Sequence, residues 1–187
     1  LAADAVGWRG AFGLLALLSL LVALALQWKM PALEGAPRMP LAQQLRVLRT
    51  PRFLAQIALS VLVFTAMFTA YTYLADILER LAGFDGTLVG WCLMGFGAVG
   101  LIGNSLGGRM VDRHPLIASM VFSAFMIGAL LALVPSIHSS LALAAALAIW
   151  GITQSALFLV SHVRLMKIAP QAPAFAASLN IAGGNLG

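Results

Sequence analysis

Apolar residues run along this chain in long blocks separated by charged residues, and this pattern predicts membrane-spanning helices. The charged residues that bound the first three blocks are Arg9, Lys29, Arg52, Asp76, Asp85 and Arg109. A longer block follows, and the polar segment 135–140 divides it into helices expected near 115–135 and 141–163. Each helix is long enough to cross a hydrocarbon core, which needs about 20 residues. A sixth helix is expected to begin near Pro173.

The composition supports lipid as the surrounding solvent. Hydrophobic residues make up 61% of the 187 residues and charged residues only 9%, whereas soluble domains have roughly 25% charged residues. Backbone polar groups in lipid must be satisfied within the segment, which favours helices, and no alternating pattern indicates a barrel. The sequence therefore predicts an all-α fold, a polytopic membrane helix bundle.

The loops between these helices alternate in charge, and the alternation predicts their orientation. The basic residues of the first, third and fifth loops are Lys29, Arg38, Arg46, Arg49, Arg52, Arg109, Arg113, Arg164 and Lys167. The second loop is mainly acidic and the fourth has only His138. Since basic loops stay on the cytoplasmic side, the N-terminal residue is expected outside. The net charge of +5 is thus a sign of topology, and no nucleic-acid partner is expected.

Three regions are expected along the chain. Residues 1–28 form a transmembrane helix, residues 29–52 a cytoplasmic loop, and residues 53–187 a transmembrane bundle. The loop contains leucines on one face of a short amphipathic helix, which are Leu41, Leu45 and Leu48. Such a helix would lie on the inner leaflet. The alternative is a solvated linker with scattered leucines.

Small residues share one face of the third expected helix. They recur at helical spacing as Gly97, Gly100, Asn104 and Gly107. In lipid, small residues allow two helix backbones to approach closely. This face therefore predicts close helix packing, either static or allowing one helix to slide against another.

The end of the same helix carries a charged motif. Gly108, Asp112 and Arg113 form a G-x-x-x-D-R pattern that resembles the loop motif of the major facilitator superfamily, found between its second and third helices and between its eighth and ninth. The family motif continues with Gly-Arg, and this chain has His114-Pro115-Leu116 instead. The resemblance implies a charge contact of Asp112 and Arg113 at an inner gate. The alternative is a helix-end cluster that anchors topology.

Two further segments are similar to the same family. Segment 7–12 (Gly-Trp-Arg-Gly-Ala-Phe) resembles the start of the sixth helix in its drug:proton antiporter branch, and segment 177–187 resembles the eleventh helix of arabinose-efflux-permease-like members. On this mapping the chain covers helices six to part of eleven, most of one six-helix half. The chain starts with Leu1 and stops in an apolar stretch, so both ends are expected to lie within a longer protein. The resemblance implies alternating access, with proton-coupled efflux of a sugar or drug.

Polar and aromatic residues within the spans are candidates for the substrate pathway. They are Thr65, Thr69, Thr72, Tyr73, Gln154 and Phe158. Polar side chains in a span tend to face the bundle interior or a water-filled cavity, and helices seven and ten of the family border its central pathway. The alternative for these residues is hydrogen bonding between helices, or of a threonine to its own backbone.

The sequence shows no residue pattern for proton coupling within the spans, for catalysis or for metal binding. No acidic or basic residue lies deep within a span, and His162, near a helix end, is expected to be interfacial. A proton-coupling residue is therefore expected in an N-terminal half outside this chain. No H-E-x-x-H pattern or nucleophile–base pair is present, so an enzyme, a metal site and a cofactor are not expected. The expected partners are lipid, protons and a small molecule, the location a bacterial inner membrane, and the rival function a non-transporting scaffold.

Overall fold

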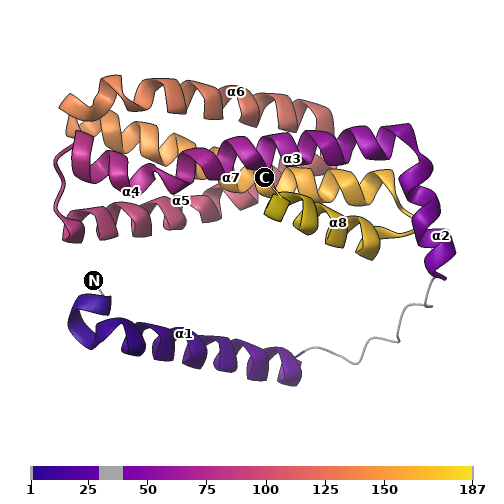
Figure 1. Cartoon of the computed structure of the whole chain (residues 1–187), viewed down its shortest axis with the longest axis horizontal. Helices are drawn as coiled ribbons and strands as arrows, with labels where there is room; N and C mark the ends of the chain where they lie inside the picture. Colours follow the sequence, from indigo (N-terminus) through magenta and orange to yellow (C-terminus); the bar gives the residue numbers. More distant parts are fainter. Residues whose placement is uncertain (1, 30–39, 187) are drawn as a thin grey trace. The chain divides into compact units, whose positions relative to one another are not determined.

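The structure is a computed structural model that describes residues 2–29 and 40–186, with the side chains of residues 2–8, 11 and 41–43 excepted. The described residues are almost entirely helical and include no strand (Figure 1). This confirms the all-α prediction. The chain divides into two units, residues 1–38 and 39–187, and each is considered by itself. The predicted outer position of Leu1 and residues 30–39 of the predicted loop at 29–52 lie outside the described residues.

Most helices of the second unit run along the bundle and are joined by short turns (Figure 1). In chain order the described elements are α1 (Ala2–Lys29), α2 (Leu41–Arg46), η1 (Val47–Arg49), α3 (Pro51–Thr72), α4 (Leu74–Asp76), η2 (Ile77–Leu81), α5 (Gly86–Arg113), α6 (Pro115–Leu133), η3 (Pro135–His138), α7 (Ser140–Ile168) and α8 (Pro173–Leu186). The predicted break at 135–140 is the η3 turn between α6 and α7. Proline at the start of α3 and α6 suits a first helical turn, where no N–H bond is lost.

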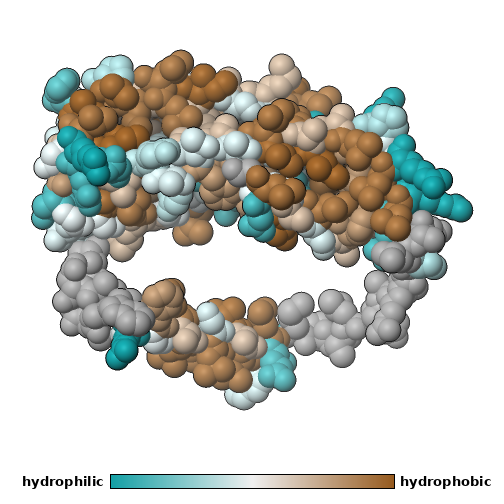
Figure 2. Space-filling view, in the orientation of Figure 1, coloured by the Kyte–Doolittle hydropathy of each residue, from teal (hydrophilic) through white to brown (hydrophobic). Residues whose placement is uncertain are grey.

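Five helical segments are long and apolar enough to cross a membrane among the described residues. They are Phe12–Lys29, Pro51–Leu81, Gly86–Arg113, Pro115–Leu133 and Ser140–Ile168. In Figure 2, hydrophobic side chains cover most of the middle of the bundle, and most of the hydrophilic ones gather at its two ends. This distribution matches a bilayer, with apolar tails around the middle and water at the ends. The chain is therefore a multi-pass membrane protein.

The second span continues beyond the charged residue at which the sequence pattern stopped it. Asp76 forms a salt bridge to Arg80 (Oδ1–Nε 2.6 Å), one helical turn further on. The helix passes through α4 and the π-helical η2 before it ends at Leu81. Side chains four residues apart lie on the same face of a helix. This ion pair therefore stabilises the continuation of the helix at the membrane surface.

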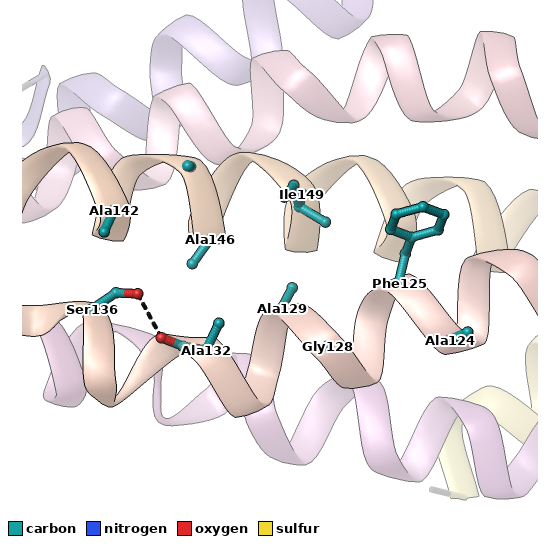
Figure 3. A pocket seen from close by; sticks show the side chains of 10 residues that line it. Ala124, Phe125, Gly128, Ala129, Ala132, Ser136, Ala142, Ala146 and Ile149 are labelled. Carbon is teal, nitrogen blue, oxygen red and sulfur yellow. Dashed lines mark hydrogen bonds between the residues drawn. The ribbon is translucent and has the colours of Figure 1, made fainter.

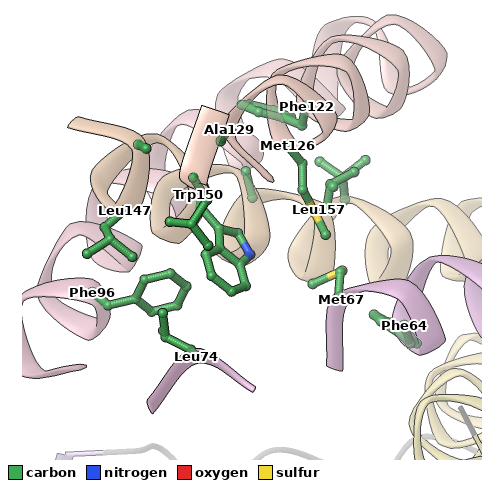
Figure 4. Packing of buried hydrophobic residues seen from close by; sticks show 14 of the residues in the cluster. Phe64, Met67, Leu74, Phe96, Phe122, Met126, Ala129, Leu147, Trp150 and Leu157 are labelled. Atoms are coloured by element: carbon green, nitrogen blue, oxygen red, sulfur yellow. The ribbon is translucent and has the colours of Figure 1, made fainter. Parts of the chain in front are cut away.

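The core of the bundle lies around α7, which contacts α3, α5, α6 and α8. Trp150 of α7 is fully buried. Its ring meets Phe96 of α5 edge to face, with centroids 5.3 Å apart (Figure 4). Further along α7, Leu157 belongs to the same buried cluster as Met67 of α3. The central position of α7 explains why it contributes to each polar feature described below.

Helices α5 and α7 approach so closely that side chains are excluded from their contact. A Cβ atom added to Gly100 would lie 2.5 Å from the Ser155 hydroxyl oxygen, and one added to Gly107 would lie 3.0 Å from the Ala156 Cα atom. Gly103 faces the Ile152 carbonyl oxygen and has even less room. The close contact predicted for this face therefore involves Gly100 and Gly107.

The other two residues predicted for that face lie elsewhere. Gly97 is exposed and a Cβ there would meet no atom within 4 Å, while Asn104 is also exposed. Successive helix residues turn by about 100°, so the centre of the contact falls between Gly100, Gly103 and Gly107. Gly97 and Asn104 lie to one side of it. In the structure, the α5–α7 contact is therefore rotated by part of a turn from the face that the sequence predicts.

The segment before α3 contains the short α2 helix and the η1 turn. Val47, which was not among the predicted apolar residues, is buried in a cluster with Phe53 and Leu165. Leu48 packs against this cluster, whereas Leu45 is 45% exposed. The change from α to 3-10 geometry alters the residues per turn, which brings Val47 to the bundle. The segment thereby attaches to the ends of α3 and α7.

Candidate functional site

A cavity of about 210 Å³ lies between α3, α5 and α7. The residues that line it are Met67, Phe68, Asn104, Gln154, Ser155 and Phe158. Gln154 lies midway along α7, which places the cavity near the middle of the spans. Predicted pathway residues Gln154 and Phe158 therefore meet here, together with Asn104 from the predicted packing face.

Gln154 is held by a hydrogen bond within α7. The indole Nε1–H of Trp150 donates to its Oε1 at 2.8 Å. Because Trp150 is fixed in the core by Phe96, the amide of Gln154 has a defined orientation. Its amide nitrogen has no hydrogen-bond partner among the described residues. Gln154 can thus present two N–H donors at the cavity wall.

Aromatic rings form the wall beside Gln154. Phe158 stacks at a tilt on the buried Phe64 of α3, with ring centroids 5.3 Å apart, and Phe68 lies 6.4 Å from Phe64. Phe158 is nevertheless 45% exposed. Tilted pairs of this kind are favourable beyond simple burial. The cavity combines apolar rings with the amides of Asn104 and Gln154, a lining suited to a small amphipathic molecule.

The predicted threonine stripe lies on an exposed face of α3 beside Phe68. The hydroxyl groups of Thr65 and Thr72 donate to the carbonyl oxygens one turn earlier, Val61 and Phe68, at 2.8 Å. Thr69 is exposed between them. These hydroxyls satisfy their own helix, as threonine in a helix often does. None of the three lines the cavity, although their oxygens remain able to accept hydrogen bonds.

Tyr73 lies further from the cavity than the threonines. It is 59% exposed at the end of α3, where the helix breaks before α4. Its neighbour Tyr71 contacts the ring of Phe96 at 5.6 Å. The structure therefore separates Tyr73 from Gln154 and Phe158.

The charged motif at the end of α5 contacts α7. The Oδ1 atom of Asp112 lies 3.3 Å from Lys167 Nζ, which also donates to the Val111 carbonyl oxygen at 2.9 Å. Arg113 is exposed and has no partner among the described residues. Neighbouring helix residues point in different directions, so Asp112 and Arg113 do not meet here. Gly108 lies one turn earlier, with Leu159 of α7 nearby.

His162 approaches α8 near the same end of the bundle. Its Nδ1 atom is 3.4 Å from Asn180 Nδ2, and the buried Asn180 Oδ1 has no partner among the described residues. No group of three residues able to bind a metal ion occurs in the part of the chain that the structure describes. His162 is therefore a helix-contact residue of α7.

Sequence reasoning missed several residues of these sites. Lys167 is 55 positions from Asp112, so only the fold could pair them. Phe68 could have been predicted from the sequence, because it lies three and four residues from Thr65 and Thr72 and therefore on the same face of α3. Ser155 shares a broad helix face with Gln154 and Phe158 but was not among the predicted pathway residues.

Apolar helices of spanning length, with an open polar and aromatic cavity between three of them, define a polytopic membrane bundle. The chain belongs to the Major Facilitator Superfamily, whose family model matches residues 1–187. It is similar to the inner membrane transport protein YdhP of Escherichia coli O157:H7 and to YdhP of Escherichia coli strain K12. Identity to each is 29% over 98% of this chain. The chain spans about half, 47%, of the length of these relatives. Family membership confirms the predicted resemblance.

Proposed function

We propose that the chain forms most of one half of a secondary transporter that moves a small molecule by alternating access. The cavity between α3, α5 and α7 supports this proposal. It lies at mid-depth, where transporters of this kind bind substrates between two helical halves. Gln154 and Asn104 would bind polar groups of the substrate, and Phe158 would contact its apolar part. The relatives are named as inner membrane transport proteins, which agrees with a bacterial inner membrane.

A second groove makes a useful comparison because its lining is almost wholly apolar. It lies between α6 and α7 and includes Phe125 and Ile149 (Figure 3). Its serine, Ser136, donates to the Ala132 carbonyl oxygen at 2.6 Å and so has its hydroxyl satisfied. This groove would face lipid in the proposed transporter, while the amide-lined cavity would face water.

Cysteine accessibility tests this difference without knowledge of the substrate. In the full-length protein, with native cysteines including Cys92 replaced by serine, single cysteines are placed at Asn104, Gln154 or Phe158. A charged methanethiosulfonate reagent is then added to cells, and labelling is measured. Because the thiolate is the reactive form, a position in a watered pathway reacts and one in lipid does not.

The controls are Phe125→Cys and Ile149→Cys for lipid, and His138→Cys in the turn for water. We expect labelling at the cavity positions and at His138→Cys, with little at the two lipid controls. Unreactive cavity positions beside a reactive His138→Cys would remove the cavity from the substrate pathway. So would equal labelling of the cavity and lipid positions.

The finer parts of the proposal concern direction and coupling. We propose proton-coupled efflux of a sugar or drug, with the coupling residue outside this chain because no acidic or basic residue lies deep within its spans. The charged contact of Asp112 with Lys167 would stabilise the inner end of the bundle. The reconstituted full-length protein should then move protons in the direction opposite to the substrate. Failure to move any of a broad panel of sugars and amphipathic drugs would favour the scaffold alternative.

A further inference from the structure

A second polar cavity, of about 290 Å³, lies between α3, α6 and α7. Its polar lining residues are Gln56, Ser119, Ser123, Ser161 and Arg164. It is separate from the proposed substrate cavity, since it involves α6 in place of α5. The chemistry of its lining changes along its length, and this change indicates what it binds.

Arg164 provides an unneutralised charge within this cavity. Its guanidinium Nη1 donates to the Ser119 hydroxyl at 2.6 Å, and the side chain is partly buried. No carboxylate pairs with Arg164 among the described residues, and the acidic residue described at this end of the bundle, Asp112, pairs with Lys167. A partly buried charge that lacks a counter-charge is costly. An anionic ligand would supply the missing counter-charge.

The depth of the lining residues gives the cavity a polar end and an apolar end. Arg164 is four residues from the end of α7, and Ser119 is four residues from the start of α6. The apolar residues Val63 and Leu157 lie about 17–18 Å from the same ends of their helices, at 1.5 Å per residue. Arg164 and Ser119 therefore lie near the membrane surface, with the apolar Leu116 beside them, while Val63 and Leu157 line the cavity toward the middle of the membrane.

The same end of the bundle is strongly basic. Exposed basic residues there that form no salt bridge among the described residues are Arg46, Arg49, Arg52, Arg109 and Arg113, and Asp112 is the one acidic residue described at this end. Anionic lipids concentrate beside such clusters, with about 1 kcal/mol of attraction for each basic residue near the surface. Charge complementarity thus favours an anionic occupant drawn from the bilayer.

We infer that this cavity binds one anionic phospholipid. Its phosphate accepts hydrogen bonds from the other N–H groups of Arg164, and an acyl chain extends along Val63 and Leu157. Ser119 positions the guanidinium, because its hydroxyl accepts from Nη1 and donates to the Pro115 carbonyl oxygen at 3.1 Å. Arginine suits a phosphate because its planar donors can bind two oxygens together. The apolar end distinguishes a lipid from free phosphate, which would gain nothing from Val63 or Leu157. This site does not depend on the transported substrate.

Native mass spectrometry of the delipidated full-length protein tests the inference. The protein is titrated with phosphatidylglycerol or with phosphatidylcholine of the same chains. We expect the first phosphatidylglycerol to bind about tenfold more tightly, because phosphatidylcholine has the same phosphate but adds a choline cation that cancels its net charge beside Arg164. Arg164→Gln should reduce this affinity to that of phosphatidylcholine. The matched control Arg109→Gln, which removes an exposed charge at the same end, should change it less than about twofold.

A second variant tests the apolar end without changing the charge. Ser123→Phe fills the cavity between the helices and should also abolish the preference, even if Arg164→Gln fails to fold. The inference is overturned if both lipids bind equally to the unmodified protein. It is equally overturned if Arg164→Gln and Arg109→Gln weaken binding alike, or if millimolar inorganic phosphate displaces the bound lipid. A preference retained in Arg164→Gln would also overturn the inference, because a charge other than Arg164 would then bind the lipid.

Discussion

At the scale of single residues, Gly103 shows how the absence of a side chain determines the position of a helix. Its Cα hydrogen faces the Ile152 carbonyl oxygen of α7 so closely that no Cβ fits. The atom in the way belongs to the backbone, which cannot turn aside as a flexible side chain would. Gly151 of α7 is restricted in the same way by the Phe96 carbonyl oxygen, 2.9 Å from an added Cβ.

We therefore predict that Gly103→Ala destabilises the bundle by about 1–3 kcal/mol, the usual cost of inserting a carbon atom into a packed core. The measurement is the free energy of unfolding of the purified protein in detergent. Gly97→Ala is the matched control, because it makes the same substitution on the same helix where nothing lies within 4 Å. It should be neutral or slightly stabilising, since alanine favours helix. Equal effects of the two variants would contradict the proposed contact.

At the scale of helices, the uncharged blocks were enough to predict the described spans. In lipid, a single block of this length can satisfy its backbone polar groups only as a helix. The spans could therefore be predicted without knowing which segments pack beside them. The contact face of α5 was harder to predict, because Gly97 and Gly103 are the same residue type. Only the position of α7 shows which of them lies in the contact. Of the predicted pathway residues, Gln154 and Phe158 line the cavity between α3, α5 and α7. The others, which are Thr65, Thr69, Thr72 and Tyr73, do not line it. Which residues meet across helices depends on how the helices pack, and the local sequence pattern does not determine that packing.

The contact between the ends of α5 and α7 leads to a prediction about two charges. Lys167 Nζ bonds both the Asp112 carboxylate and the Val111 carbonyl oxygen, and Val111 lies in the last turn of α5, where carbonyl groups lack helical partners. Lys167→Gln removes both bonds and should cost about 1 kcal/mol of unfolding free energy. Asp112→Asn removes only the exposed ion pair and should cost less than about 0.5 kcal/mol.

Unfolding in detergent at low and high salt separates these contributions, because only the exposed ion pair is strongly screened. Arg113→Gln is the control, as Arg113 has no partner among the described residues, and it should leave stability unchanged. A larger loss for Arg113→Gln than for Lys167→Gln would show that the arginine, as the family resemblance implied, is the partner of Asp112.

At the scale of the whole molecule, the cavity between α3, α5 and α7 is open. Phe158 is 45% exposed and Asn104 is exposed, although both lie near the middle of spans that cross lipid. Polar side chains at that depth need a partner or water. In a transporter built from two helical halves, the second half covers such a site and completes the pathway. The 47% coverage of the relatives agrees with one half.

It follows that this chain expressed alone should not move substrate, whereas the full-length protein should. Both are reconstituted into proteoliposomes at equal density, and uptake of a substrate found for the full-length protein is measured. The alternating mechanism needs two bodies that rock around one site, and one half has no second body to rock against. A co-expressed polypeptide that carries the remaining spans should restore part of the uptake, because the cavity face of α3, α5 and α7 would again be covered. Uptake by the chain alone would mean that two copies complete the pathway, with Gln154 and Phe158 contributed from both.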